Sequence, residues 1–166
     1  MICFCAANVL FCSQQTLPCV ELPVAQSAFG WGSGDPCEGK EYCLTVYLTP
    51  WCPACKSSVT FINELREYFS DNNQFALQVI VGADGEANLE QMAKQIGKLV
   101  YIDADAKFRR ATGVHAYPTW LLTDKNRKII KMYKRGAPYG GTTESRIKFF
   151  FEKELDFKLS RLSRGQ

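Results

Sequence analysis

An apolar segment that runs straight into a pair of cysteines constrains this chain more than any other feature. Residues 42–48 are rich in β-branched and aromatic side chains and lie between chain breakers, as expected of a buried strand. The segment leads to Cys52 and Cys55, which are separated by Pro53 and Ala54. Proline suits the first turn of a helix, where a missing N–H costs nothing. The pattern therefore predicts a strand, a cysteine pair and then a helix.

The rest of the chain alternates between strand and helix patterns. Apolar residues after the cysteine pair recur at steps of three and four, which predicts an amphipathic helix from residue 55 to about residue 70. The further expected elements are strands at 75–81, 99–102, 117–123 and 128–133, helices near 89–96 and 108–113, and a last helix capped by Thr142 or Thr143. This order predicts an α/β fold with a central mixed sheet of about four to five strands flanked by helices.

The composition is that of a globular protein with a packed core. The chain has 166 residues, of which 46% are hydrophobic and 22% charged. Its formal net charge of +3 is too small to indicate nucleic acid or anionic lipid as a partner. No apolar run approaches the roughly 20 residues that cross a bilayer, so we expect at most a membrane tether at one end.

The N-terminal part differs from the rest in composition. Residues 1–36 mix cysteine, proline, glycine and serine without periodicity, so we expect a cysteine-rich extension or linker there and one domain at 37–166. Residues 1–12 have the length and apolarity of a signal-peptide core but lack preceding basic residues. An atypical export segment, a non-native start and an N-terminal strand are the alternatives for this stretch.

All eight cysteines fall within the first 55 residues. Cys37 and Cys43 flank an expected turn and are the candidates for a structural disulfide, which favours an extracytoplasmic location such as the periplasm or cell envelope. A cytosolic chain can also keep free thiols, so the cytoplasm is the alternative. No role is predicted for the four remaining cysteines outside the pair at 52 and 55, namely Cys3, Cys5, Cys12 and Cys19.

Two segments resemble the thioredoxin-like superfamily. They are Thr49-Pro50-Trp51-Cys52-Pro53-Ala54-Cys55-Lys56 and Thr112-Gly113-Val114-His115-Ala116-Tyr117-Pro118-Thr119, and the resemblance spans roughly residues 42 to 155. The long stretch before Tyr117 is more similar to the TlpA-like envelope branch than to minimal thioredoxin. The resemblance implies that Pro118 is a cis proline facing the cysteine pair. It also implies that Trp51, Tyr117 and Pro118 contact the substrate.

Two cysteines at this spacing across a helix start support thiol-disulfide exchange. The free N–H groups of the first turn stabilise a thiolate on Cys52, and Cys55 lies one turn further on, close enough to bond with it. We expect Cys52 to attack a disulfide of a client protein and Cys55 to resolve the mixed disulfide. The expected activity is therefore that of a monomeric protein thiol-disulfide oxidoreductase, without cofactor or metal, regenerated by a redox partner.

One position departs from classical thioredoxins. They carry a buried acid six residues before the first cysteine, where it assists proton transfer to the resolving sulfur, and this chain has Val46 there. Cys55 must therefore lose its proton to water, to Lys56 or to another group. We expect His115, the only histidine, to be a surface residue.

Other functions compete with this one. The cysteine pair can be half of a zinc site, but Cys37 and Cys43 have five intervening residues instead of the usual two to four. A redox-inactive binding module of the same fold is a further alternative, one that handles copper through Cys3 and Cys5 or binds a partner protein. A peroxidase or glutathione-linked enzyme is disfavoured because peroxidases of this fold place their reactive cysteine in a different sequence setting.

Overall fold

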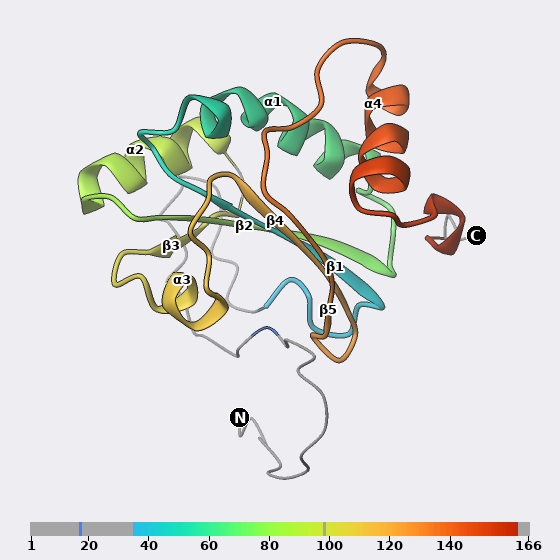
Figure 1. Cartoon of the computed structure of the whole chain (residues 1–166), viewed down its shortest axis with the longest axis horizontal. Helices are drawn as coiled ribbons and strands as arrows, with labels where there is room; N and C mark the ends of the chain where they lie inside the picture. Colours follow the sequence, from blue (N-terminus) through green and yellow to red (C-terminus); the bar gives the residue numbers. More distant parts are fainter. Residues whose placement is uncertain (1–16, 18–34, 98, 163–166) are drawn as a thin grey trace, which may run out of the picture.

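The computed structural model describes Leu17, residues 35–97 and residues 99–162, and its centre is a five-stranded mixed sheet (Figure 1). The strands are β1 (Tyr42–Leu48), β2 (Phe75–Gly82), β3 (Tyr101–Asp103), β4 (Thr119–Asp124) and β5 (Ile129–Tyr133). Their order is β3-β2-β1-β4-β5, with β1, β2 and β3 parallel and β4 antiparallel to both of its neighbours. The expected α/β fold is confirmed.

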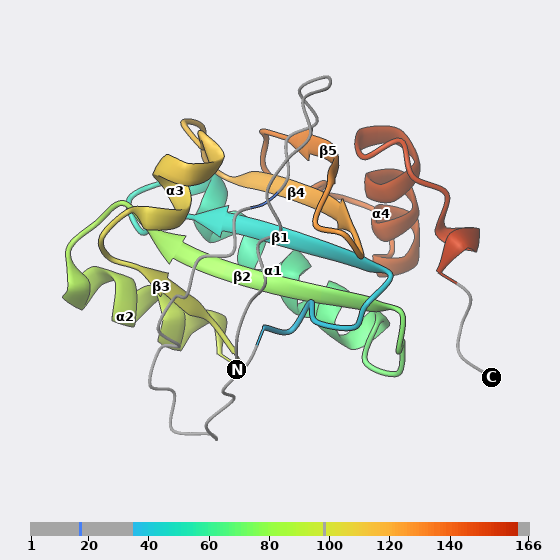
Figure 2. The ribbon, with the colours of Figure 1, turned by 90° about the horizontal axis from the view of Figure 1, so that it is seen from below.

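Helices cover both faces of this sheet. Figures 1 and 2 show α1, α2 and α4 over one face and α3 beside the other. The bounds are α1 (Pro53–Tyr68), α2 (Glu86–Ile96), α3 (Lys107–Thr112) and α4 (Thr143–Phe149). Among the described residues, no helix has both the length and the apolarity that a membrane crossing requires.

The alternation of side chains along β1 divides the core into two clusters. Val46 and Leu48 face the cluster that also contains the buried residues of α1, α2 and α4. Tyr47, between them in sequence, faces a second cluster with Phe108 of α3. Successive side chains of a strand point to opposite faces, so β1 takes part in both clusters. Leu17 packs into the second cluster, and its N–H donates to the carbonyl of Arg127.

Several boundaries differ from the sequence expectation, among them the start of α2 at Glu86 instead of residue 89 and β3 at Tyr101–Asp103 instead of 99–102. Helix α1 begins two residues earlier, at Pro53, because Cys52 acts as its N-cap. Strand β4 begins at Thr119 instead of residue 117, because a cis Tyr117–Pro118 peptide bond precedes the ladder. The last helix changes after α4 into a π-helical turn, Phe150–Glu154, in which the adjacent Phe150 and Phe151 are both fully buried.

The expected extension at 1–36 lies outside the described residues except for Leu17, Asp35 and Pro36. The same holds for the signal-like segment 1–12 and for the cysteines before residue 37.

A buried carboxylate connects β3 to α3 and β1. Asp103 is 1% exposed and accepts hydrogen bonds from the Tyr47 hydroxyl at 2.9 Å and from the N–H groups of Phe108 and Arg109, both at 3.0 Å. Burial, and then the charge of Asp103, raise the pKa of Tyr47, so its hydroxyl remains a donor. Gly82 leaves room for this contact, since an added Cβ would overlap with the Tyr47 hydroxyl.

We expect Asp103→Ala to lower the free energy of unfolding by about 3 kcal/mol, because two buried donors and one partly buried donor lose their acceptor. Asp105→Ala is the control, since the Asp105 side chain is 74% exposed and pairs only with Lys107 at the surface. Urea unfolding of both variants measures the difference. Equal stabilities would contradict a structural role for Asp103.

Candidate functional site

The cysteine pair lies where β1 joins α1. Cys52 occupies the N-cap position with an extended backbone, φ −87° and ψ 116°, and Pro53 takes the first helical position. The N–H of Cys55 donates to the Cys52 sulfur at 3.4 Å. The same N–H also donates to the Cys52 carbonyl at 3.1 Å, so it is shared between two acceptors, and it lies close enough to Cys52 Sγ to stabilise negative charge there.

The loop before β4 packs against Cys52. The Tyr117–Pro118 peptide bond is cis, as the resemblance implied, and the Cys52 thiol donates to the carbonyl of Tyr117 at 3.4 Å. Cys52 retains 7% of its surface, while Pro118 is buried. The structure thus brings together two segments that are 65 residues apart.

Cys55 lies deeper than Cys52. Its side chain is fully buried, and its sulfur accepts the N–H of Thr49 at 3.5 Å. Burial raises the pKa of the Cys55 thiol to about 12, and the hydrogen bond from the Thr49 amide opposes that shift in part. Cys55 is a protonated thiol at neutral pH, which is the state expected of a sulfur that acts second.

Trp51 forms the exposed border of the site. It is 58% exposed, although its indole N–H donates to the carbonyl of Ala83 at 3.0 Å. Its ring meets the Tyr117 ring edge to face, with centroids 5.3 Å apart. An aromatic side chain held this way presents a rigid apolar surface beside Cys52.

Tyr117 is fixed by a residue that the sequence did not reveal. The Tyr117 hydroxyl accepts a hydrogen bond from the Arg109 guanidinium at 3.2 Å. Arg109 belongs to α3, and no motif marks it in the sequence. His115 lies nearby in the chain and is exposed, in keeping with the expected surface position.

A cleft of about 260 Å³ opens next to Trp51. Lys56 of α1 and Asn88, Gln91 and Gln95 of α2 contribute to its walls. These side chains supply hydrogen-bond donors and acceptors of the kind that match peptide groups. The cleft therefore lies between Trp51, which precedes Cys52, and α2.

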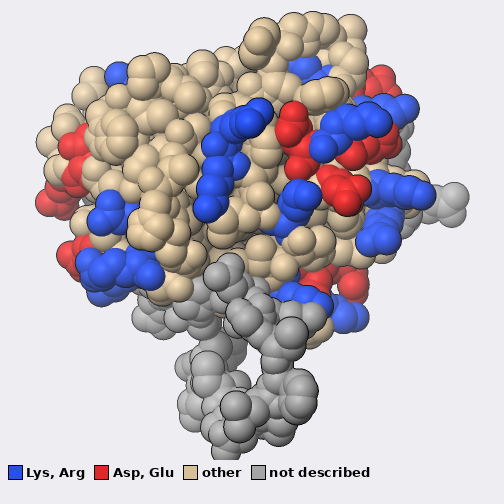
Figure 3. All heavy atoms as spheres, in the orientation of Figure 1, with Lys and Arg blue, Asp and Glu red and all other residues tan. Residues whose placement is uncertain are grey.

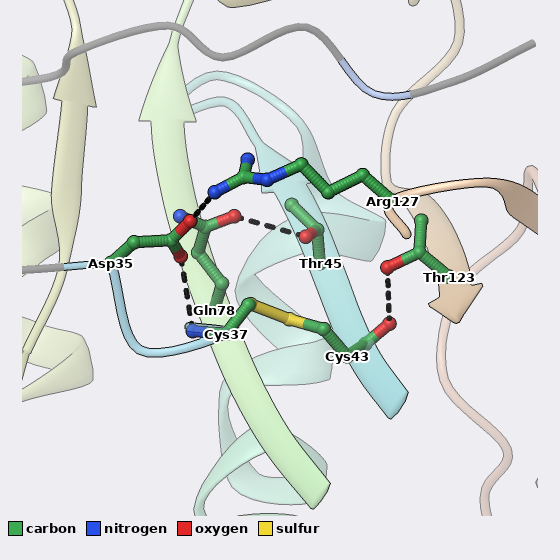
Figure 4. Close-up of a disulfide and its surroundings, with 7 residues drawn as sticks. All are labelled: Asp35, Cys37, Cys43, Thr45, Gln78, Thr123 and Arg127. Carbon is green, nitrogen blue, oxygen red and sulfur yellow. Dashed lines mark hydrogen bonds and ion pairs between the residues drawn. A yellow bond between two sulfur atoms is a disulfide. The ribbon is translucent and has the colours of Figure 1, made fainter. Parts of the chain in front are cut away.

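Cys37 and Cys43 are joined as a disulfide, with their Cα atoms 5.5 Å apart (Figure 4). The turn that carries Cys37 is held by Asp35, which accepts the Cys37 N–H at 3.0 Å and forms an ion pair with Arg127. Cys43 stands at the start of β1 and Cys52 beyond its end, about 20 Å away for a strand of this length. This disulfide is therefore separate from the Cys52–Cys55 site.

The fold and the cysteine pair at the β1–α1 junction define a thioredoxin-like protein. Residues 31–148 match the model of the Redoxin family, and the chain belongs to this family. The resemblance to the thioredoxin-like superfamily is confirmed.

The chain is similar to several thiol-disulfide oxidoreductases. It is 31% identical over 106 residues to ResA of Geobacillus thermodenitrificans, an alignment that covers 57% of this chain and 60% of ResA. The structure of a thiol-disulfide oxidoreductase from Bacteroides fragilis matches with a TM-score of 0.59 at 17% identity, covering 81% of this chain and 98% of that one. A putative thioredoxin from Neisseria meningitidis matches with a TM-score of 0.54 at 24% identity, covering 78% and 86%.

The burial of Cys55 predicts a pH dependence of stability for the reduced protein. Its thiol ionises near pH 9 in a solvated chain and near pH 12 in the folded one. Between these values the folded state binds more protons than the unfolded state. The contribution of the Cys55 thiol to the free energy of unfolding is therefore complete below pH 9 and declines towards pH 12. Denaturant unfolding across this range should show a steeper loss for the wild type than for Cys55→Ala. An equal decline of stability with pH in the wild type and in Cys55→Ala would contradict the raised pKa of Cys55.

Proposed function

We propose that this chain is a protein thiol-disulfide oxidoreductase in which Cys52 is the nucleophile and Cys55 the resolving cysteine. The observation that carries the proposal is the position of Cys52 as N-cap of α1, with the N–H of Cys55 directed at its sulfur. The similarity to ResA supports the same activity, although the chain spans 60% of the length of that relative. No cofactor is needed, since two sulfurs exchange both electrons.

The proposed reaction has two steps. The Cys52 thiolate attacks one sulfur of a client disulfide, forming a mixed disulfide and releasing the other client sulfur as a thiolate. Cys55 then gives up its proton and attacks Cys52, which closes the Cys52–Cys55 disulfide and releases the client reduced. Run in reverse, the same steps oxidise a client dithiol. A redox partner regenerates the pair, and the reduction potential relative to its environment sets the direction.

The client surface that we propose consists of Trp51, Tyr117 and Pro118. The exposed Trp51 ring and the cis peptide border Cys52 from two sides, and the cleft beside Trp51 carries polar groups that suit an extended peptide. Figure 3 shows basic and acidic side chains scattered over one face of the molecule, without a large field of one sign. This distribution supports docking through shape and main-chain contacts.

We further propose that the protein works outside the cytoplasm, in the periplasm or cell envelope. The Cys37–Cys43 disulfide supports this location, because such bonds persist in oxidising compartments. A solved relative from Streptococcus pneumoniae is named an exposed lipoprotein thioredoxin, which agrees with the proposal.

Cysteine variants test the proposed roles. We expect Cys52→Ser to abolish reduction of insulin disulfides, and Cys55→Ser to accumulate a mixed disulfide that non-reducing gels and mass spectrometry detect. The double variant Cys37→Ser/Cys43→Ser is the control. It should keep its exchange activity, because the disulfide that it removes lies at the other end of β1 from Cys52. Full activity of Cys52→Ser would overturn the proposal.

Trp51→Ala tests the client surface. We expect the KM for a protein disulfide to rise about tenfold, because the variant loses the apolar surface that a docked chain would cover. The rate with glutathione disulfide, which is too small to use that surface fully, should change little. Phe149→Ala is the matched control, an aromatic residue on α4 that is 48% exposed. Equal losses with both substrates would assign Trp51 to the chemistry instead of to docking.

A further inference from the structure

The resolving step needs a group that stabilises charge on Cys55. In that step the thiol proton leaves, the Cys55 sulfur bonds to Cys52, and the bond between Cys52 and the client sulfur breaks. The departing client thiolate takes up a proton, so electrons and protons balance. Cys55 is fully buried, and an apolar environment opposes formation of its thiolate.

No buried carboxylate of the described residues is placed to assist. Val46 faces the cluster that contains Cys55, and it has no ionisable group. Asp103, the buried acid, bonds to Tyr47 and to the start of α3, on the opposite face of the sheet. Lys56, the candidate base from the sequence, is exposed on α1 and borders the cleft.

One buried hydroxyl, next to Cys55, differs from the other buried hydroxyls in lacking a hydrogen-bond partner. The described part of the chain has five buried serine and threonine side chains, and four of them have hydrogen-bond partners: Thr45 with Gln78, Ser58 with Ala54, Thr119 with Ala116 and Thr123 with Cys43. The fifth, Thr49, is fully buried, and its Oγ1 has no partner. The backbone N–H of this residue already donates to the Cys55 sulfur at 3.5 Å.

We infer that the Thr49 hydroxyl is a second hydrogen-bond donor to the Cys55 thiolate during resolution. This inference rests on the proposed exchange reaction and adds a residue to it. The hydroxyl rotates so that Oγ1–H meets the sulfur as negative charge develops, alongside the Thr49 N–H. A hydrogen bond to a charged group is stronger than one to a neutral thiol, so the contact favours the reacting state.

The electrostatics of the site agree with this geometry. Burial is the largest influence on the pKa of Cys55 and raises it, whereas the Thr49 amide lowers it; the Thr49 hydroxyl also lowers it because it lies near the sulfur, although it makes no hydrogen bond of normal geometry to the neutral thiol. Thr49 therefore offers two donors from one residue where the fold supplies no acid.

Thr49→Val and Thr49→Ser separate the hydroxyl from the shape of the side chain. The reduced full-length protein is mixed with glutathione disulfide, quenched with acid and analysed by mass spectrometry of the peptide that holds Cys52 and Cys55. Formation of the Cys52–glutathione adduct reports the first step, and its conversion to the Cys52–Cys55 disulfide reports resolution. We expect Thr49→Val to slow resolution about tenfold near neutral pH and to shift its pH profile upward by about one unit. Thr49→Ser should restore the rate.

Stability provides an independent measurement. Thr49→Val should be at least as stable as the wild type, because it removes an unsatisfied buried hydroxyl. Thr45→Val, the matched control, should lose stability with its bond to Gln78 and keep the rate of resolution. Wild-type resolution by Thr49→Val, or equal slowing by Thr49→Val and Thr49→Ser, would overturn the inference while leaving the exchange reaction intact. Absence of both the Cys52–Cys55 disulfide in the wild type and a Cys52–glutathione adduct in Cys55→Ser would overturn the proposed function and this inference with it.

Discussion

The capping of α1 by Cys52 is the constraint on which the rest of the structure depends. A helix N-terminus has donors that lack intrahelical acceptors, and here the N–H of Cys55 is shared between the carbonyl and the sulfur of Cys52. Two prolines restrict the backbone on either side, since Pro50 and Pro53 fix their own φ angles. The strand before them fixes which residues face α1, and a shift of one residue would exchange Val46 and Leu48 with Tyr47. Strand register and helix capping therefore determine together where Cys52 and Cys55 lie.

Tyr117 packs against the clusters on both faces of the sheet. Its ring lies 5.9 Å from that of Tyr47 in the α3-side cluster and 5.3 Å from that of Trp51 at the site. Its hydroxyl accepts from Arg109, and its carbonyl accepts from Cys52. The acceptor role of Asp103, which holds the start of α3, thus supports the loop that borders Cys52. Contacts on the α3 side of the sheet therefore help to position the loop that lies against Cys52.

The sequence predicted the fold and the cysteine pair because both follow from local patterns. Period-two and helical apolar spacing determined the elements, and the glycine that ends α3 takes the left-handed conformation expected of such a stop, with φ 66° at Gly113. The cis peptide required the family resemblance, since a local pattern does not specify it. Contacts between distant segments were not predictable, among them Trp51 with Ala83 and Arg109 with Tyr117. They depend on how α3 and the loop after β2 approach the site.

The position of Thr49 illustrates a conflict between stability and chemistry. A valine of nearly the same shape would fill the site without leaving a polar atom unpaired, and burying a hydroxyl without a partner costs about 1–3 kcal/mol. That cost is present whenever Cys55 is a neutral thiol, which is a weak acceptor. It is recovered when the sulfur carries charge, because only then does the hydroxyl face a strong acceptor. A site that is unsatisfied at rest and satisfied during reaction lowers the barrier between the two states, which is the physical basis of electrostatic preorganisation.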